Sequence, residues 1–229
     1  MGTTKSLNLM REHAEVYEPS QEPRILEAER IWCLTLTGRG EPGGAVYQEA
    51  VDTLFGLARR LRRDAQRLGR DFKLMPLECT YWSARKGRAL EEVPRGSWHW
   101  RLNIRMPSFM KAKDLALACA QLEDRRETAM ARAVKIEWLA LGRTVQALHV
   151  GPYDSEAATL EQMRAAAAAR GLALNGPHHE VYLSDPGKTP PERLRTLLRR
   201  PLQGIPAAPR RSRAAGSGRP RRHGKRPIF

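Results

Sequence analysis

The same order of predicted elements occurs twice along this chain, and this duplication restricts the possible folds more than any other feature of the sequence. Each unit consists of a strand, a glycine turn, an amphipathic helix, a second strand, a loop and a third strand. In the first unit the elements other than the loop are at 31–37, 38–44, 46–68, 74–83 and 98–105. In the second unit they are at 143–150, 151–154, 156–170, 178–184 and 194–201. We therefore expect an α+β fold in which duplicated strand-helix-strand-strand units form pseudo-symmetric antiparallel sheets, with helices on one side and a central ligand groove. The alternative is an ordinary α+β domain whose halves are similar by chance.

Local patterns agree with these elements. The helix predicted over 46–68 has one apolar stripe, because its apolar residues recur every three or four positions. The stripe consists of Tyr47, Val51, Leu54, Ala58, Leu61, Ala65 and Leu68. In the second half, the strands predicted over 134–141 and 144–150 are separated by Gly142, which favours a hairpin between them.

The second strand of the second unit carries the main chemical candidate. Alternation along a strand places His178, Glu180 and Tyr182 on one face. A carboxylate that projects beside a phenol into an enclosed groove would be the main polar group of an otherwise apolar, aromatic pocket. The alternative is a surface strand with a solvated glutamate.

The duplication also predicts a second acid. It aligns Glu78 with Glu180, because each occupies the start of the exposed face of its unit's second strand. Two units packed side by side would then place both carboxylates and Trp82 at a central groove. If the similarity of the halves is accidental, the acids lie far apart.

Positive charge is concentrated at the C-terminus. The net charge is +15, and residues 204–229 contain eight lysines and arginines and no acid. We expect an arm at 1–23, a domain at 24–203 whose repeats (about 24–110 and 134–203) are joined by a helix, and a basic disordered tail at 204–229. Phosphate neutralisation would give the tail weak, non-specific nucleic-acid binding; the alternative is a solubilising extension.

Several classes of protein are excluded by composition. No apolar run approaches the 18 or so residues of a membrane span, and the N-terminus lacks the apolar segment of a secretory signal. Cys33, Cys79 and Cys119 lack metal-ligand spacing, which indicates reduced thiols and a cytoplasmic protein. Adjacent strand residues point apart, so His178 and His179 cannot easily share a metal. We expect neither a metal nor a cofactor.

The sequence resembles the GyrI-like small-molecule-binding proteins over about residues 5–203, and more closely the stand-alone branch that includes cyclopropanoid cyclopropyl hydrolases. The segments that carry the resemblance are Tyr47–Ala50, Pro76–Glu78, Trp82, Ile104–Pro107, Val145–Gln146, His149–Glu156 and His178–Pro186. Two segments depart from the usual pattern of the branch. The chain has Glu78-Cys79-Thr80-Tyr81-Trp82 in place of a Glu-Gly-X-Trp-Trp run, and Leu141-Gly142 in place of Glu-Gly.

The resemblance implies a protein that binds or detoxifies planar, often DNA-alkylating compounds, and hence a role in antibiotic resistance through two SHS2-type repeats. Hydrolysis of the cyclopropane would need a base for water, for which we choose Glu180, and a donor to the developing oxyanion, Tyr153 or Tyr182. Glu78 would orient the water. The substrate would be contacted by Trp82, Trp98, Trp100, Tyr81, Met106, His149 and His178. For each tryptophan the alternative is core packing, and for the protein it is a non-catalytic module that binds planar or cationic aromatic compounds.

Overall fold

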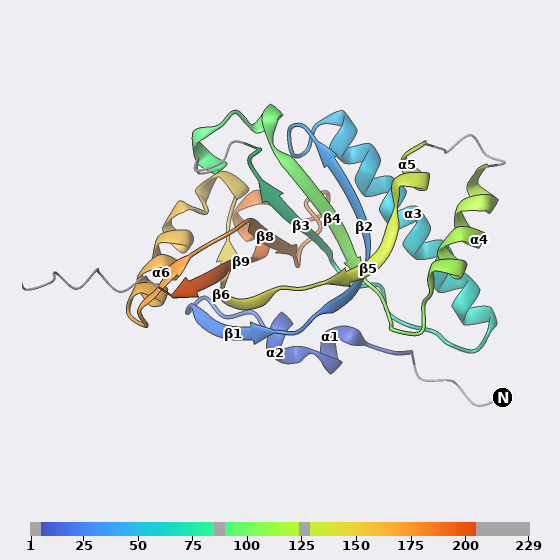
Figure 1. The fold of residues 1–229 in the computed structure, drawn as a ribbon, viewed down its shortest axis with the longest axis horizontal. Helices are drawn as coiled ribbons and strands as arrows, with labels where there is room; N and C mark the ends of the chain where they lie inside the picture. Colours follow the sequence, from blue (N-terminus) through green and yellow to red (C-terminus); the bar gives the residue numbers. More distant parts are fainter. Residues whose placement is uncertain (1–5, 85–89, 124–128, 205–229) are drawn as a thin grey trace, which may run out of the picture.

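The computed structural model describes residues 6–84, 90–123 and 129–204, which form an antiparallel sheet flanked by helices (Figure 1). The strands are β1 (Arg24–Ala28), β2 (Ile31–Arg39), β3 (Leu77–Trp82), β4 (His99–Arg105), β5 (Lys135–Leu139), β6 (Gly142–Val150), β7 (Leu172–Leu174), β8 (His178–Tyr182) and β9 (Arg195–Gly204). The helices are α1 (Leu9–Glu12), α2 (Ala14–Tyr17), α3 (Ala45–Arg67), α4 (Ala112–Glu123), α5 (Ala129–Ala133) and α6 (Ala157–Ala168). The predicted α+β class is confirmed, and the basic tail lies outside the described residues apart from its first residue.

The order of the strands has the symmetry that a duplicated unit requires. The order is β1-β6-β9-β8-β3-β4-β2-β5, with β7 on β9. The second strands of the two units, β3 and β8, pair at the centre. Each is flanked by its unit's third strand and then by its first strand. The two units are therefore related by an approximate two-fold axis at the β3–β8 pair, as the duplication predicted.

The predicted hairpin between β5 and β6 is wrong. Strand β5 pairs with β2 of the first unit, whereas β6 pairs with β1 and β9. Gly142 does reverse the backbone, with a φ of 64° that favours glycine. However, β5 is at one edge of the sheet, and β6 is the second strand from the other edge. The two edge strands, β1 and β5, each pair with the unit that is more distant from them in sequence. Gly142 predicts a turn from the local sequence, but the strands with which β5 and β6 pair are distant in sequence.

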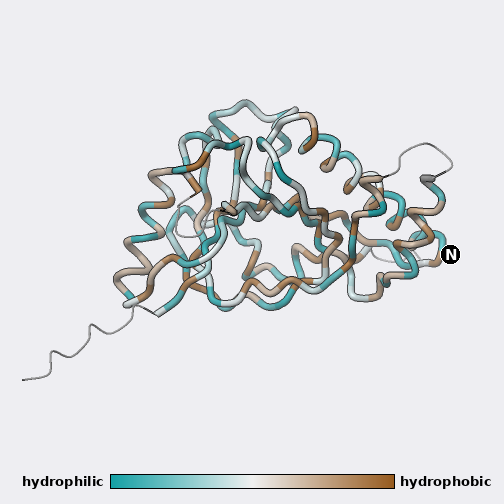
Figure 2. Tube along the Cα trace, turned by 45° about the horizontal axis from the view of Figure 1, so that its top comes forward, coloured by the Kyte–Doolittle hydropathy of each residue, from teal (hydrophilic) through white to brown (hydrophobic). Residues whose placement is uncertain are grey.

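Both long helices cover the same face of the sheet, at its two sides (Figure 1). In α3, Tyr47 contacts Tyr81 of β3 by a hydroxyl–hydroxyl hydrogen bond of 2.8 Å. In α6, Met163 packs against Leu198 of β9. Leu198 and Tyr81 are on the same face of the sheet. Leu198 is opposite Glu180, and Tyr81 is opposite His178. Glu180 and His178 are two residues apart on β8, so their side chains point to the same side. We call this the helix face. Figure 2 shows brown hydrophobic residues alternating with teal hydrophilic ones along the chain, as such one-sided packing requires.

The N-terminal arm lies against the opposite side of the sheet, which we call the arm face. Its anchors Val16 and Tyr17 are 4% and 3% exposed, and Arg199 of β9 donates to the Val16 carbonyl at 2.6 Å. A cavity of about 500 Å³ lies beside α1, lined by Ser6, Leu7, Asn8, Arg11, Glu12 and Lys73. This cavity is at the arm and not at the seam between the units, so the central groove stays a prediction.

Two short strands were missed, and the thiols were placed nearly as expected. Strands β1 and β7 were not predicted, because Arg-Ile-Leu-Glu-Ala does not alternate and three residues are too few to show an alternation. Cys33 and Cys79 are buried and Cys119 is half-buried, all as free thiols.

Among the helices of the described ranges, none has the length and apolar character needed to cross a bilayer.

Candidate functional site

Glu180 lies at the seam between the two units, on the helix face of the sheet. It is opposite Cys79 of β3, and His178 is opposite Tyr81. Directly opposed residues of antiparallel strands share a face, so these four side chains lie together. Glu180 is only 8% exposed. The alternative of a surface strand with a solvated glutamate is therefore wrong.

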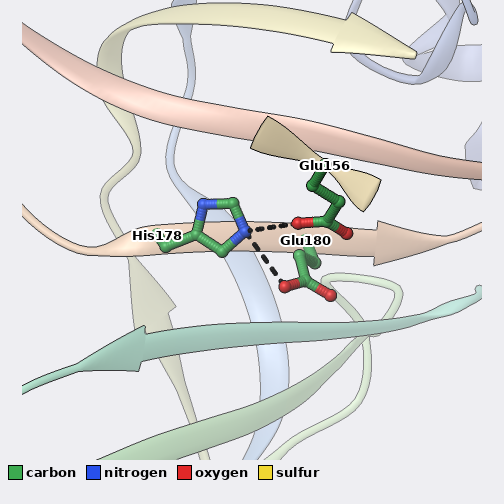
Figure 3. A group of neighbouring side chains, drawn as sticks. All are labelled: Glu156, His178 and Glu180. Atoms are coloured by element: carbon green, nitrogen blue, oxygen red, sulfur yellow. Dashed lines mark ion pairs between the residues drawn. The ribbon is translucent and has the colours of Figure 1, made fainter. Parts of the chain in front are cut away.

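Glu180 belongs to a buried cluster with His178 and Glu156 (Figure 3). The His178 Nε2 atom lies 3.0 Å from Glu180 Oε1 and 3.4 Å from Glu156 Oε2. His178 and Glu156 are 6% and 8% exposed. Glu156 comes from the start of α6, and Figure 3 shows both carboxylates directed at the same imidazole nitrogen. Two acids from different elements thus share one base.

The charge of this cluster favours a protonated imidazole. Burial disfavours the charged form of His178, but hydrogen bonds to Glu156 and Glu180 outweigh it and raise the pKa of His178 to about 9. Burial raises the pKa of Glu156, and the negative charge of Glu180 adds to this effect while His178 opposes it. The protonated ring of His178 therefore faces two acidic side chains.

A fixed turn before α6 presents Tyr153 to the cluster. The His149 Nε2–H donates to the Pro152 carbonyl at 3.1 Å, and Nδ1 accepts from the Thr159 hydroxyl at 3.1 Å. Gly151 adopts a φ of 139°, and a Cβ there would lie 3.4 Å from the His149 ring. Both nitrogens of His149 are thus used by the turn, which gives this predicted substrate contact a structural role.

Aromatic side chains in contact with one another lie beside the cluster, and the Tyr81 ring stacks on His178. The Tyr81 hydroxyl is hydrogen-bonded to those of Tyr182 at 2.6 Å and Tyr47 at 2.8 Å. Tyr153 packs edge-on against Tyr182, and Trp98 packs edge-on against Tyr81, both with centroids 5.7 Å apart. Burial and the carboxylates of Glu180 and Glu156 raise the pKa of Tyr153 to about 12. Tyr153 is therefore a neutral hydrogen-bond donor at neutral pH.

Three predicted contacts have other surroundings, although Trp100 is opposite Tyr81 on the same face. Trp100 is 1% exposed, and its ring fills the space that a side chain at Gly38 would occupy. Met106 is 2% exposed and lies one residue beyond the end of β4 that is distant from the cluster. Trp82 stacks on His99 at 5.8 Å on the arm face. For Trp100 the alternative of core packing accounts for the geometry, and the structure does not bring Met106 or Trp82 to Glu180.

Glu78 lies on the arm face, so the prediction that both acids project into one groove is wrong. It is opposite Val181, whereas Glu180 is opposite Cys79. The alignment of the two units was displaced by one residue, and a displacement of one residue moves every side chain of a strand to the other face. Aligning Cys79 with Glu180, and so Tyr81 with Tyr182, keeps both strands on the same face.

On the arm face, Glu78 is held by a saturated network. It accepts hydrogen bonds from the Tyr17 hydroxyl at 2.6 Å and His179 Nε2 at 2.8 Å, and Arg199 lies at 3.5 Å. Burial opposes ionisation, but the hydrogen bond from His179 and the Arg199 charge outweigh it and lower the pKa of Glu78 to about 2. Burial lowers the pKa of His179, whose neutral ring accepts from the Thr80 hydroxyl at 2.9 Å. Every group here has a partner within the protein.

The spacing of the helix-face cluster is also that of a metal-ligand set. One donor atom each from Glu156, His178 and Glu180 lies within 4.8 Å of the other two. Imidazole and carboxylates suit zinc and similar cations. A single imidazolium proton shared between two carboxylates produces the same short contacts, so the spacing alone does not require an ion. His178 and His179 point to opposite faces, as predicted.

Comparisons with known proteins give a consistent assignment. The model of the GyrI-like small molecule binding domain matches residues 119–203. An uncharacterized conserved protein from Listeria innocua is 30% identical, with a TM-score of 0.80 over 86% of this chain and 100% of that one. The chain belongs to the GyrI-like family. Two structures from the same organism, described as hydrolases, are 28% and 29% identical, with TM-scores of 0.76 and 0.77, and cover 86% and 87% of this GyrI-like chain and 100% of their own.

More distant matches show the fold alone. The C-terminal domain of EcmrR is 11% identical, with a TM-score of 0.51 over 80% of this chain and 98% of that domain. A comparison with curated proteins found no match. The GyrI-like fold is therefore shared with a domain of very different sequence.

Sequence reasoning missed Glu156 and Arg199. From the sequence, Glu156 was only the first residue of the helix predicted over 156–170 and the last residue of the segment His149–Glu156 that carries part of the resemblance. Arg199 follows two leucines in the last predicted strand. A basic residue in such a buried strand is a signal for a buried acid, and the pattern does not say which acid.

Proposed function

We propose that this protein is a hydrolase that opens the electrophilic cyclopropane of planar, DNA-alkylating compounds and so detoxifies them. The observation that carries the proposal is the state of the two oxygens of Glu180. One oxygen is anchored by His178 at 3.0 Å. The other has no ion pair or hydrogen bond in the described part of the chain, and Glu180 keeps 8% exposure, which leaves this oxygen available to water in the proposed mechanism. An anchored carboxylate with one oxygen open to water is what a general base requires.

The chemistry would proceed in one balanced step. The Glu180 carboxylate takes a proton from water while the water oxygen attacks a cyclopropane carbon. The carbon–carbon bond breaks, and its electron pair passes through the conjugated ring to the dienone oxygen, which becomes a phenolate. Tyr153 donates a hydrogen bond to that oxygen, because its own pKa of about 12 keeps it protonated. Tyr182 is the less suitable donor, since its hydroxyl is already bonded to Tyr81.

The surroundings of Glu180 suit a flat substrate. Tyr153, Tyr182, Tyr81 and Trp98 lie in edge-to-face contact around the cluster, and aromatic faces favour a planar ring system. The two similar structures described as hydrolases, each covered completely by this chain, support a hydrolytic role. Of the predicted aromatic contacts, the proposal keeps Trp98 and Tyr81 and does not use Trp82 or Trp100.

Turnover of a duocarmycin-type compound by Glu180→Gln tests the base. Glutamine keeps an oxygen for His178 but cannot accept the proton of water, so we expect turnover to fall by at least about 100-fold. The matched control is Glu161→Gln, which changes an exposed acid of α6 that pairs with Arg164 and should leave turnover unchanged. Equal turnover in wild type and Glu180→Gln would remove Glu180 from the mechanism.

A non-catalytic drug-binding module is the second candidate. It is favoured by the matched family model, which describes a small-molecule-binding domain. The two candidates differ in stoichiometry. Incubation of excess compound with the protein gives product beyond one equivalent if the protein is a hydrolase, and only a bound complex if it is a trap.

A further inference from the structure

Glu156 has no part in the mechanism proposed above, yet its placement is costly. It is 8% exposed, and its Oε1 atom is fully buried with no hydrogen-bond partner among the described residues. Burial of an unpaired carboxylate oxygen destabilises the folded state. Such a group needs a reason beyond stability. Its ion-pair partner among the described residues is His178, whose Nε2 atom lies 3.4 Å from Oε2.

The position of that contact relative to Glu180 is informative. His178 and Glu180 are on the same strand and face, so β8 alone sets their backbones. The side chain of His178 can still rotate about its bonds. Glu156 comes from a separate element, behind a turn that His149 holds at both ring nitrogens. It therefore approaches Nε2 from a second, independently fixed direction.

We propose that Glu156 is a positioning residue of the hydrolytic site: it holds the His178 ring so that Nε2–H fixes one oxygen of Glu180 and leaves the other free for water. This inference depends on the proposed hydrolase function. Glu156 does not touch the substrate in this scheme. It acts through His178, and its loss should weaken the rate of the chemical step more than the binding of the compound.

The kinetic test is Glu156→Gln with the same compound. We expect kcat to fall about 10-fold to 30-fold while KM changes less than about threefold, since only the orientation of Glu180 is altered. Glu156→Asp should recover part of kcat, because it restores the charge at a greater distance. The matched control is again Glu161→Gln on α6. An unchanged kcat in Glu156→Gln, or a kcat loss matched by an equal rise in KM, would refute the positioning role.

A second readout does not need turnover. In the ¹⁵N spectrum of the histidine rings at pH 7, His178 should carry protons on both nitrogens in the wild type and shift toward the neutral form in Glu156→Gln, but not in Glu161→Gln. If wild type shows no turnover and this shift is present, the hydrolase function fails and the contact stands. If the shift is absent, the positioning role fails by itself. Loss of wild-type activity on dialysis against EDTA, restored by Mn²⁺ or Zn²⁺, would also overturn it, because the three side chains would then be metal ligands.

Discussion

The two faces of the central strand pair each bury a glutamate beside a histidine, and they treat this pair in opposite ways. On the arm face, Glu78 is 0% exposed and has three partners. On the helix face, Glu180 is 8% exposed and has one ion-pair partner among the described residues. The same two residue types therefore form a closed structural network on one side and, in the proposed function, the base of the reaction on the other.

The difference comes from the count of charges around each histidine. Arg199 supplies a permanent cation to Glu78, so His179 needs no proton and burial lowers its pKa. No such cation faces Glu180 in the described ranges, and a second acid, Glu156, is added. His178 then becomes the cation of its cluster despite its burial, with a pKa raised to about 9. The arginine on one face and the second acid on the other therefore agree with the opposite pKa shifts of the two histidines.

The largest expected effect comes from Glu78→Gln. This change removes the charge opposite Arg199, which is 1% exposed and cannot lose its proton at any ordinary pH. An uncompensated buried charge costs about 3–5 kcal/mol. We expect that loss in the free energy of unfolding, measured by urea denaturation. Arg199→Met combined with Glu78→Gln should recover part of it, and an effect of Glu78→Gln below about 1 kcal/mol would contradict the closed network.

A smaller effect is expected from acid. The pKa of Glu78 is about 2 when folded and near its ordinary value of 4.5 when unfolded. A lowered folded pKa contributes stability that is complete above pH 4.5 and is lost as the pH falls toward 2. The loss is on the order of 3 kcal/mol, since one pKa unit corresponds to about 1.4 kcal/mol. Urea titrations between pH 5 and 2 measure it, and the Glu78→Gln variant should show a flatter profile; parallel profiles would assign the acid sensitivity to other groups.

The same comparison shows what the sequence could predict. The helix predicted over 46–68 is α3, Ala45–Arg67, because a periodicity of six turns is a strong local signal. The duplication was also visible, since each unit repeats its own local pattern. Both therefore follow from residues close together in the chain.

What failed depends on distant residues. The alignment of the units was wrong by one position, and this placed Glu78 on the face of Glu180. Neither residue's neighbours in sequence reveal the error, because strands of both units alternate equally well in either alignment. Glu156 and Arg199 were missed for the same reason: each acquires its role from a partner more than twenty residues away. The face on which a side chain lies and the charges beside it depend on how the strands pair, and the sequence of a single strand does not determine either.

The smallest expected effect is on stability in Glu180→Gln, and it completes the comparison with Glu78→Gln. His178 keeps Glu156 as a counter-ion and an amide oxygen in place of the lost carboxylate. His178 can also lose its proton to water and become neutral, which an arginine cannot do. We expect the free energy of unfolding to change by less than about 1 kcal/mol, although a buried ion pair loses one member. Urea denaturation of both variants at pH 7 makes the measurement. A loss in Glu180→Gln as large as that in Glu78→Gln would mean that Glu180 is a structural ion like Glu78, and any fall in its turnover would then reflect unfolding and not the loss of a base.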